Sequence, residues 1–557
     1  MKTPRMTGAL LLAFFVPSIL AQKAVTAMDW AQSGVTVPTI IDIHASPYRP
    51  KIVYRTNINN QRFDMRNATV LDMIEFAYGL GEQDDDRENA AIVGGPPWID
   101  WDRFDLSALL PPVEGSIATP EHFQGDPNSR GRSVVRQALT DRFHLKYHTG
   151  ESPLSGFIVT VGKDGPKLTE ANDPSAEGDC RGERDKADPA QYTLICTSET
   201  IEHFVADRAQ DFPQPIVDRT GLTKAYDFTL KLQLGPDVHT RDDRALVFTE
   251  AFRKQLGLVV RRGEVPQPAF VVDAVDHTPT PNLPESIKLL PALPDLEFEV
   301  ASIRPSAEDE PHDQIRPGGS QITFRGFNLQ GLVTLAWQLP TGAMLGDALP
   351  KLPQQRYTIL VSLPPGIDGR AVNQDPDQIA AMLQKLLIDR FGIRLHWGEW
   401  TQPDAYVLYA ASPKMKKADP GLRSFCKFGP AEGGKPARYA GSPFDAEFHC
   451  QNVTMAQFAD RLQAVAGSDI KNRVPDRTGL TGSYTFTVFF TSSRTLRART
   501  ATAASEAKQA DEATEALLDG RSLEDAFRKE LGLKIQRRPV TIPALILDHF
   551  DQTPTEN

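Results

Sequence analysis

Residues 217–222 read Val-Asp-Arg-Thr-Gly-Leu, and residues 475–480 read Pro-Asp-Arg-Thr-Gly-Leu. A stretch of alternating apolar residues follows each copy. A segment Ala-Phe-Arg-Lys-x-Leu-Gly-Leu comes next, at residues 251–258 in one case and 526–533 in the other. The same segments in the same order indicate that the chain contains one unit twice. The division of the remaining sequence follows from this duplication.

The offset between matching residues grows slowly along the chain. It is 248 residues between Asp141 and Asp389, 258 residues between Asp218 and Asp476, and 275 residues for the segment that begins at Ala251. Such a drift, with the order of segments preserved, indicates a tandem duplication with loop insertions and not a solenoid of short repeats.

The alignment predicts four parts of the chain. They are a signal peptide at residues 1–27, a first repeat at 38–282, a linker at 283–295 and a second repeat at 296–557. Three prolines in the linker region break any regular element and predict a semi-rigid connection. The length of 557 residues also requires more than one hydrophobic core.

The N-terminus is typical of an export signal. Lys2 and Arg5 precede an apolar run of about 14 residues that ends at Ala21. Small residues predict cleavage after Ala21 or Ala27. The run is shorter than the roughly 20 residues that span a bilayer, and an uncleaved interfacial anchor is the alternative. We expect a mature protein without a transmembrane segment, in the periplasm or secreted.

Strand-like and helix-like patterns alternate within each repeat and predict an α+β fold, with mixed or antiparallel sheets and helices packed on one face. In the second repeat, residues 377–391 have helical spacing and end at Gly392. We expect a hairpin at 393–400 and 405–411. Residues 448–547 show a β-α-β-β-α-β-like order that resembles the small modules of envelope secretins, and this analogy of fold does not fix function.

Four cysteines are present, one pair in each repeat. In an exported protein this pattern predicts one disulfide per repeat, Cys180 with Cys196 and Cys426 with Cys450. Closing a loop of ~15 residues stabilises a fold by roughly 3 kcal/mol in the chain-entropy model. A zinc site is the alternative, but the spacing lacks a close Cys-x-x-Cys pair and nearby histidines.

The repeated Asp-Arg-Thr-Gly-Leu segment allows an acid–base or a structural interpretation. An aspartate beside an arginine is held ionised, and the arginine cannot usefully release its proton, so the pair is poor acid–base machinery. We predict a structural turn in which aspartate and threonine bind the backbone and glycine supplies a positive φ. Its residues are Asp218, Arg219 and Gly221, and Asp476, Arg477 and Gly479.

Other candidate sites are weaker. His144 and His148 could bind a metal, with surface or packing roles as the alternative. Residues 84–86 are three aspartates, but calcium needs more oxygen ligands at defined spacing, which favours a solvated loop. Two tryptophan pairs could stack on a sugar, with core packing as the alternative; they are Trp98 with Trp101, and Trp397 with Trp400. We therefore predict no catalytic, cofactor or metal site.

Several motifs taken together carry a family resemblance. They are Phe-Glu-Val-Ala-Ser-Ile-Arg-Pro at 298–305, Gly-Gly-Pro-Pro-Trp at 94–98, Arg-Phe-Asp at 103–105, Asp-Arg-Phe at 141–143 and 389–391, the two Asp-Arg-Thr-Gly-Leu segments, and Thr-Pro-Thr-x-Asn at 278–282 and 553–557. The set resembles a soil-associated, mainly acidobacterial family of uncharacterised exported proteins. Residues 41–46 depart from the first motif, and residues 346–353 replace the Gly-Gly-Pro-Pro-Trp segment in the second repeat, so a site built there would be single. In some relatives the domain is attached to a membrane metallopeptidase of the antibiotic-sensor type, which implies sensing or binding.

The formal net charge of −11 gives no basic footprint for nucleic acid. We searched for nucleophile elbows, phosphate loops and zinc motifs and found none. The sequence therefore favours a non-catalytic module of the cell envelope that binds an envelope protein or a small ligand. The alternatives are an extracytoplasmic sensor domain with a membrane partner and a hydrolase with unrecognised carboxylates, and two clustered acids with raised pKa values would favour the hydrolase.

Overall fold

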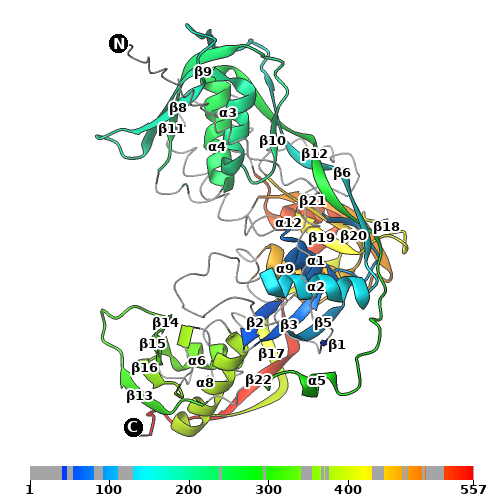
Figure 1. Ribbon diagram of the computed structural model, residues 1–557, viewed down its shortest axis with the longest axis vertical. Helices are drawn as coiled ribbons and strands as arrows, with labels where there is room; N and C mark the ends of the chain where they lie inside the picture. Colours follow the sequence, from blue (N-terminus) through cyan, green and yellow to red (C-terminus); the bar gives the residue numbers. More distant parts are fainter. Residues whose placement is uncertain are drawn as a thin grey trace, which may run out of the picture. The chain divides into compact units, whose positions relative to one another are not determined.

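The computed structural model describes residues 40–46, 54–59, 61–80, 92–110, 129–235, 238, 241–292, 297–339, 354–365, 369–370, 375–428, 445–466, 470, 474–491, 496 and 520–555. The chain separates into two units, residues 1–36 and 37–557, and all described residues belong to the second. Figure 1 shows strands and helices mixed along this unit. The α+β fold class predicted from the sequence is confirmed.

Each repeat begins with a four-stranded antiparallel sheet and two helices. The strand orders are β1-β5-β3-β2 and β13-β16-β15-β14. The elements of the first repeat are β1 (Ile41–Ala45), β2 (Arg55–Asn59), β3 (Arg62–Thr69), α1 (Val70–Tyr78), β5 (Arg103–Leu109) and α2 (Ser129–Asp141). Those of the second are β13 (Val300–Pro305), β14 (Gln314–Pro317), β15 (Gln321–Asn328), α6 (Leu329–Ala336), β16 (Arg356–Ser362) and α8 (Pro376–Phe391).

The first helix of each repeat starts at a side-chain cap. Thr69 and Asp72 form a reciprocal capping box on α1, and Asn328 accepts a hydrogen bond from the Gly331 backbone at the start of α6. Such caps satisfy amide groups that have no partner within the helix. The apolar faces of α6 and α8 pack with the inner residues of β15 and β16, and Leu332, Leu383 and Ile359 are fully buried among them.

A long antiparallel ribbon follows in each repeat. β6 (Lys146–Val161) pairs with β12 (Leu258–Ala274), and β17 (Arg394–Ala410) pairs with β22 (Leu533–His549). In the first repeat, β4 (Ile92–Gly94) and β10 (Ile216–Asp218) extend the ribbon as parallel strands.

The hairpin predicted at residues 393–411 is wrong. Both of its arms belong to β17 and pair with the same strand, β22. A shift of register between Gln402 and Ala405 accommodates the interruption that includes Pro403. The polar and proline residues here indicated a turn, but a β-bulge places them within one continuous strand.

The C-terminal part of each repeat is a second four-stranded sheet with helices on one face. The orders are β7-β11-β9-β8 and β18-β21-β20-β19. The first comprises β7 (Thr169–Glu170), β8 (Asp179–Arg184), β9 (Gln191–Thr200), α3 (Ile201–Asp207), the 3-10 turn η2 (Arg208–Asp211), β11 (Ala225–Gln233), α4 (Arg241–Ala251) and the π-helical η3 (Phe252–Leu256). The second comprises β18 (Lys416–Lys417), β19 (Phe425–Phe428), β20 (Ala446–Thr454), α9 (Met455–Val465), β21 (Ser483–Phe490), α12 (Leu523–Ala526) and the π-helical η5 (Phe527–Leu531).

The β-α-β-β-α-β order predicted for residues 448–547 appears there as β20-α9-β21-α12-β22, with an isolated bridge between Leu408 and Asp476 in place of a strand between α9 and β21. The first repeat has the full order as β9-α3-β10-β11-α4-β12. Its strands belong to two different sheets, because β10 and β12 lie in the ribbon sheet and β9 and β11 in the C-terminal sheet. Phe204, Phe228 and Phe252 form the centre of the core between this sheet and its helices.

Two further observations concern the linker region and the hydropathy of the helices. A short helix, α5 (Ser286–Leu289), lies in the region predicted as the linker. Across the segments that the structure describes, no helix is long and apolar enough to span a membrane.

Candidate functional site

The repeated Asp-Arg-Thr-Gly-Leu segments form the same turn in both repeats. The Asp218 carboxylate accepts a hydrogen bond from the Thr220 backbone at 2.7 Å, and the Thr220 hydroxyl accepts one from the Leu222 backbone at 3.2 Å. The corresponding bonds at Asp476 and Thr478 measure 2.8 and 3.2 Å. The aspartate and threonine of each segment are therefore engaged with the backbone.

The arginine of each turn fixes the turn to the ribbon through its backbone. The Arg219 amide donates to the Val159 carbonyl and the Arg477 amide to the Leu408 carbonyl, both at 2.9 Å. Arg219 and Arg477 are both exposed. Gly221 has a φ of 72° and Gly479 a φ of 68°, in the left-handed region that favours glycine.

A second repeated motif, Asp-Arg-Phe, ties the two ends of each repeat together. The Arg142 guanidinium donates to the Thr280 hydroxyl at 2.8 Å, to the Asn282 side-chain oxygen at 2.6 Å and to the Ile41 carbonyl at 2.7 Å. Asn282 in turn forms two 2.9 Å bonds with the Ile43 backbone. This arginine clasp joins α2, the segment after the ribbon, and β1.

The second repeat contains the same clasp. Arg390 donates to the Thr555 hydroxyl at 3.0 Å and its carbonyl at 2.6 Å, and to the Ala301 carbonyl at 3.1 Å. The matching asparagine, residue 557, lies outside the described residues. The clasp explains why Asp-Arg-Phe and Thr-Pro-Thr occur together in both halves of the sequence.

The four cysteines form two cross-strand disulfides. Cys180 and Cys196 are directly opposed on β8 and β9, and Cys426 and Cys450 on β19 and β20. The S–S distances are 1.98 and 2.01 Å. The two bonds differ in their surroundings, because most of β8 is exposed whereas the first three residues of β19 are buried.

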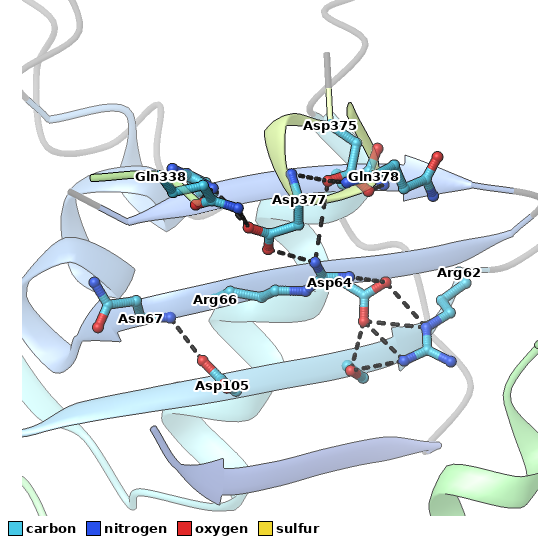
Figure 2. Close-up of polar contacts among 12 residues, drawn as sticks. Arg62, Asp64, Arg66, Asn67, Asp105, Gln338, Asp375, Asp377 and Gln378 are labelled. Atoms are coloured by element: carbon cyan, nitrogen blue, oxygen red, sulfur yellow. Dashed lines mark hydrogen bonds and ion pairs between the residues drawn. The ribbon is translucent and has the colours of Figure 1, made fainter. Parts of the chain in front are cut away.

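A cluster of charged and amide side chains joins the two repeats. Arg55 and Arg66, on β2 and β3, each donate to the Asp377 carboxylate at 2.6 Å, and Asp377 lies in the first turn of α8. Asn57 donates to Asp375 at 2.7 Å, and Gln338 donates to Asp377 at 2.7 Å. We call these six residues the inter-repeat charge network; Figure 2 shows Asp375 and Asp377 at the end of α8 and Arg66 reaching them from β3.

A further acid, Asp64, lies on β3 two residues from Arg66 and on the same face of the strand. The Asp64 carboxylate accepts bonds from the Arg62 guanidinium at 3.0 Å and from the Ser107 hydroxyl at 2.6 Å, and Arg62 also donates to the Pro291 carbonyl at 3.1 Å. Figure 2 shows Asp64 between Arg62 and the network above it. Every one of these carboxylates thus has a guanidinium or an amide partner.

The pKa values of the two helix-end acids move in opposite directions. Burial raises the pKa of Asp375, although Arg66 and the backbone amides of Gln378 and Asp377 oppose this effect. Burial also acts to raise the pKa of Asp377, but hydrogen bonds from Gln338 and Arg66 and the charges of Arg66 and Arg55 lower it below its usual value. Neighbouring acids with pKa values moved apart occur in catalytic pairs and in structural ion-pair networks. The hydrogen bonds of Asp377 to two arginines and an amide favour the structural network here.

A second contact between the repeats uses the Gly-Gly-Pro-Pro-Trp region. Asp100 and Arg423, both about 3% exposed at the side chain, form a bidentate ion pair at 2.7 and 2.8 Å. Arg423 also donates to the Ile92 carbonyl at 2.9 Å. The Trp101 indole donates to the Ser424 carbonyl at 2.7 Å, and the Arg461 guanidinium lies 5.1 Å from its ring centre. We call this the tryptophan-loop contact.

The first ribbon extends the contact onto β20. Arg262 on β12 forms an ion pair with Glu447 at 3.0 Å and donates to the Asp445 carbonyl. Nearby, His449 is buried, and its Nδ1 lies 2.9 Å from the Thr487 hydroxyl. Burial, and then the positive charge of Lys427, lower the pKa of His449 to about 4.

The histidines proposed as metal ligands lie on the surface, each in hydrogen-bond contact with an aspartate. His144 contacts Asp276 at 2.7 Å and His148 contacts Asp273 at 2.9 Å. At the position matching His148, His396 contacts Asp548 at 2.8 Å. Over the described part of the chain, no group of three or more His, Cys, Asp or Glu side chains is placed to hold a metal ion.

The tryptophans have different environments. Trp98 packs against Phe104 and His277, with ring centres at 6.5 and 4.6 Å, and Trp101 belongs to the tryptophan-loop contact. Trp397 is 62% exposed, so core packing is the wrong interpretation for this residue. Residues 84–86 and 346–353, which we discussed as an acidic loop and as a replaced motif, lie outside the described residues.

Sequence reasoning missed the residues that join the repeats. Asp100, Arg423 and Asp377 belong to no repeated motif. The available signal was an asymmetry, since the Gly-Gly-Pro-Pro-Trp segment that precedes Asp100 occurs once. A segment present in one repeat of a duplicated chain cannot serve the common fold, and contact with the other repeat is one reason to retain it.

The model of the family described as "Protein of unknown function (DUF3738)" matches residues 71–275 and 330–550. A search of curated proteins gave no match, and a search of solved structures gave none either. The two matches cover most of the chain and reproduce the duplication derived from its motifs. The chain therefore belongs to the DUF3738 family, whose domain it contains as a tandem duplicate.

Proposed function

We propose that this protein is a non-catalytic binding module of the cell envelope, exported after removal of its signal peptide. The observation that carries the proposal is that the polar side chains of the repeated motifs form hydrogen bonds within the fold. The repeated aspartate, threonine and arginine side chains bond the backbone of their own repeat. Residues engaged in this way serve the architecture, and the exposed surface of the two repeats is then available to a partner.

The charges between the repeats support the same proposal. Asp100 accepts from Arg423, and Asp377 accepts from Arg55 and Arg66, in each case across the two repeats. Burial acts to raise the pKa of Asp377, but the hydrogen bonds from Gln338 and Arg66 and the arginine charges lower it below its usual value, which makes this carboxylate a poor general acid. An envelope protein or a small ligand is the expected partner, in the compartment that the paired cysteines favour.

Catalysis is tested by a panel of chromogenic esters, glycosides, phosphates and peptides. Burial raises the pKa of Asp375, and this acid lies beside Asp377, whose pKa is lowered. Asp375→Asn is therefore the informative variant, and Asp141→Asn is its exposed control. We expect no turnover above the blank for any of the three proteins. Turnover that Asp375→Asn abolishes and Asp141→Asn retains contradicts the proposal.

Binding is tested in the native envelope. Cross-linking of intact cells, followed by purification and mass spectrometry, is expected to recover the protein with a reproducible partner and with an N-terminus at residue 22 or 28. Recovery of the chain from Met1 in the cytosol, with four free thiols and no partner, contradicts both the function and the compartment. The soil-bacterial association and the membrane sensor role stay predictions from the family resemblance.

A further inference from the structure

The β8 strand is an exposed edge of the first C-terminal sheet. It is the last strand in the order β7-β11-β9-β8, and all its residues except Cys180 are exposed. The Cys180–Cys196 disulfide and the pairing with β9 hold it in place. A fixed edge strand presents backbone groups on its outer side and is a template for pairing with another strand.

The second repeat shows a protein contact directly beside the matching edge strand. There β19 occupies the position of β8, and the residues just before Cys426 contact the first repeat. Arg423 and Ser424 bind Asp100 and Trp101. The residues just before the edge strand therefore form an interface in the second repeat, whereas Glu177, at the matching place in the first repeat, is exposed.

A second tryptophan loop does not suit the β8 edge. Glu177 lies three residues before Cys180, at the position that Arg423 takes before Cys426. An acid at the position of Asp100 would face Glu177 and be repelled. The first repeat thus requires an occupant of different charge.

The charged residues of β8 would be complementary to those of a second, antiparallel copy of the same strand. Cys180 points inward to its disulfide, so Arg181 and Glu183 share the opposite, outward face, because side chains alternate along a strand. A two-fold axis through Gly182 places Arg181 of one strand opposite Glu183 of the other, twice in each pair. Asp179 then lies opposite Asp185, whose carboxylate is occupied by the backbone amides of Ala187 and Asp188.

We propose that β8 pairs antiparallel with β8 of a second copy of this chain, centred on Gly182, so that two C-terminal sheets become continuous. Opposite charges directly across strands stabilise a pair and like charges destabilise it. Charged edge strands often prevent association, but the alternating signs here match in one register. Pairing of a six-residue edge buries less surface than the ~1,000 Å² of a stable interface. We therefore expect a reversible dimer. The proposal does not depend on the binding function.

Sedimentation velocity over a hundredfold range of protein concentration tests the proposal. Wild type is expected to change from monomer to dimer. Arg181→Glu replaces both attractive pairs by like charges and is expected to weaken the dimer about tenfold or more. The double exchange Arg181→Glu with Glu183→Arg recreates the pairs and is expected to restore it. Arg316→Glu, on the exposed edge strand β14, is the matched control and is expected to behave as wild type.

Far-ultraviolet circular dichroism and thiol titration first establish that each variant is folded with both disulfides intact. Added salt is expected to weaken the wild-type dimer, because exposed ion pairs are screened. If the wild-type protein is a monomer at every concentration, the proposal is overturned, and any partner of the β8 edge is then a different protein. A dimer that Arg181→Glu does not weaken, or that the double exchange does not restore, also overturns it.

Discussion

Gly221 and Gly257 both have left-handed backbone conformations, with φ of 72° and 69°, but their surroundings differ. A Cβ atom added at Gly221 has nothing within 4 Å, whereas one added at Gly257 meets the Gly165 carbonyl oxygen at 2.3 Å. The first glycine is therefore required by conformation alone, and the second by conformation and by space. The equivalent residues, Gly479 and Gly532, repeat this difference.

Alanine at these positions should separate the two effects. Gly221→Ala incurs only the left-handed penalty and is expected to lower the free energy of unfolding by about 1–2 kcal/mol. Gly257→Ala adds a backbone clash and is expected to cost about 1–3 kcal/mol more. Urea denaturation of both variants measures the difference. Equal losses would show that the close approach at Gly257 does not exist in solution.

His449 should make the protein sensitive to acid. Its folded pKa of about 4 lies below the ordinary value near 6.5, because burial and Lys427 disfavour the charged ring. The unfolded state therefore binds the proton first. Its contribution to stability is complete above pH 6.5 and is lost as the pH falls to about 4, by up to roughly 3 kcal/mol.

The matched variants are His449→Gln and the exposed His148→Gln. The free energy of unfolding of His449→Gln is expected to change less between pH 6.5 and 4 than that of wild type, whereas His148→Gln should follow wild type. Parallel pH profiles for wild type and His449→Gln would rule out a buried neutral histidine.

At the scale of elements, the arginine clasp joins pieces of each repeat that are far apart in the sequence. Arg142 connects the end of α2 to β1 and to the segment after β12. In the second repeat Arg390 connects the end of α8 to β13 and to the segment after β22. The clasp closes the N-terminal sheet of each repeat against the end of its ribbon.

Removing the clasp should destabilise the repeat that contains it. Arg142→Ala leaves the Ile41 carbonyl and Asn282 without the charged donor, and hydrogen bonds to charged groups contribute about 1.5–3 kcal/mol each to stability. We expect a loss of about 2–4 kcal/mol in urea denaturation. Asp141→Ala, one residue away and exposed, is the control with an expected change within about 0.5 kcal/mol. Equal effects of the two substitutions contradict the clasp.

The helices and short strands could be predicted from local sequence because their signals are local. Gly392 ends α8 with a φ of 56°, as the sequence predicts, and Asn328 and Thr454 are local side-chain caps of α6 and α9. The ribbon was mispredicted because Pro403 indicates a turn locally, and only the pairing of β17 with β22 over its whole length shows a bulge instead. Pairing between strands more than 100 residues apart has no local signature.

At the scale of the whole chain, the duplication could be predicted but the contacts between repeats could not. The duplication follows from identical motifs in one order. The contacts depend on Asp100, Asp377 and Arg423, which are unique to one repeat each and lie hundreds of residues from their partners. Duplicated units that remain alike in their cores can therefore diverge where they face one another. Asp64 on β3 has Thr323 at its register position on β15, so the acid of the first repeat is a neutral residue in the second.

The first repeat contacts the second through the buried ion pair Asp100–Arg423, and this pair tests the docked arrangement of the two repeats most directly. A double-mutant cycle with Asp100→Asn, Arg423→Met and the double variant measures the coupling of two residues 323 positions apart. Breaking a buried ion pair from one side costs about 3–5 kcal/mol. We predict that each single variant loses stability in this range in urea denaturation, and that the double variant loses much less than the sum. Losses that add, within about 0.5 kcal/mol, would mean that the two side chains do not meet and would contradict the docked arrangement.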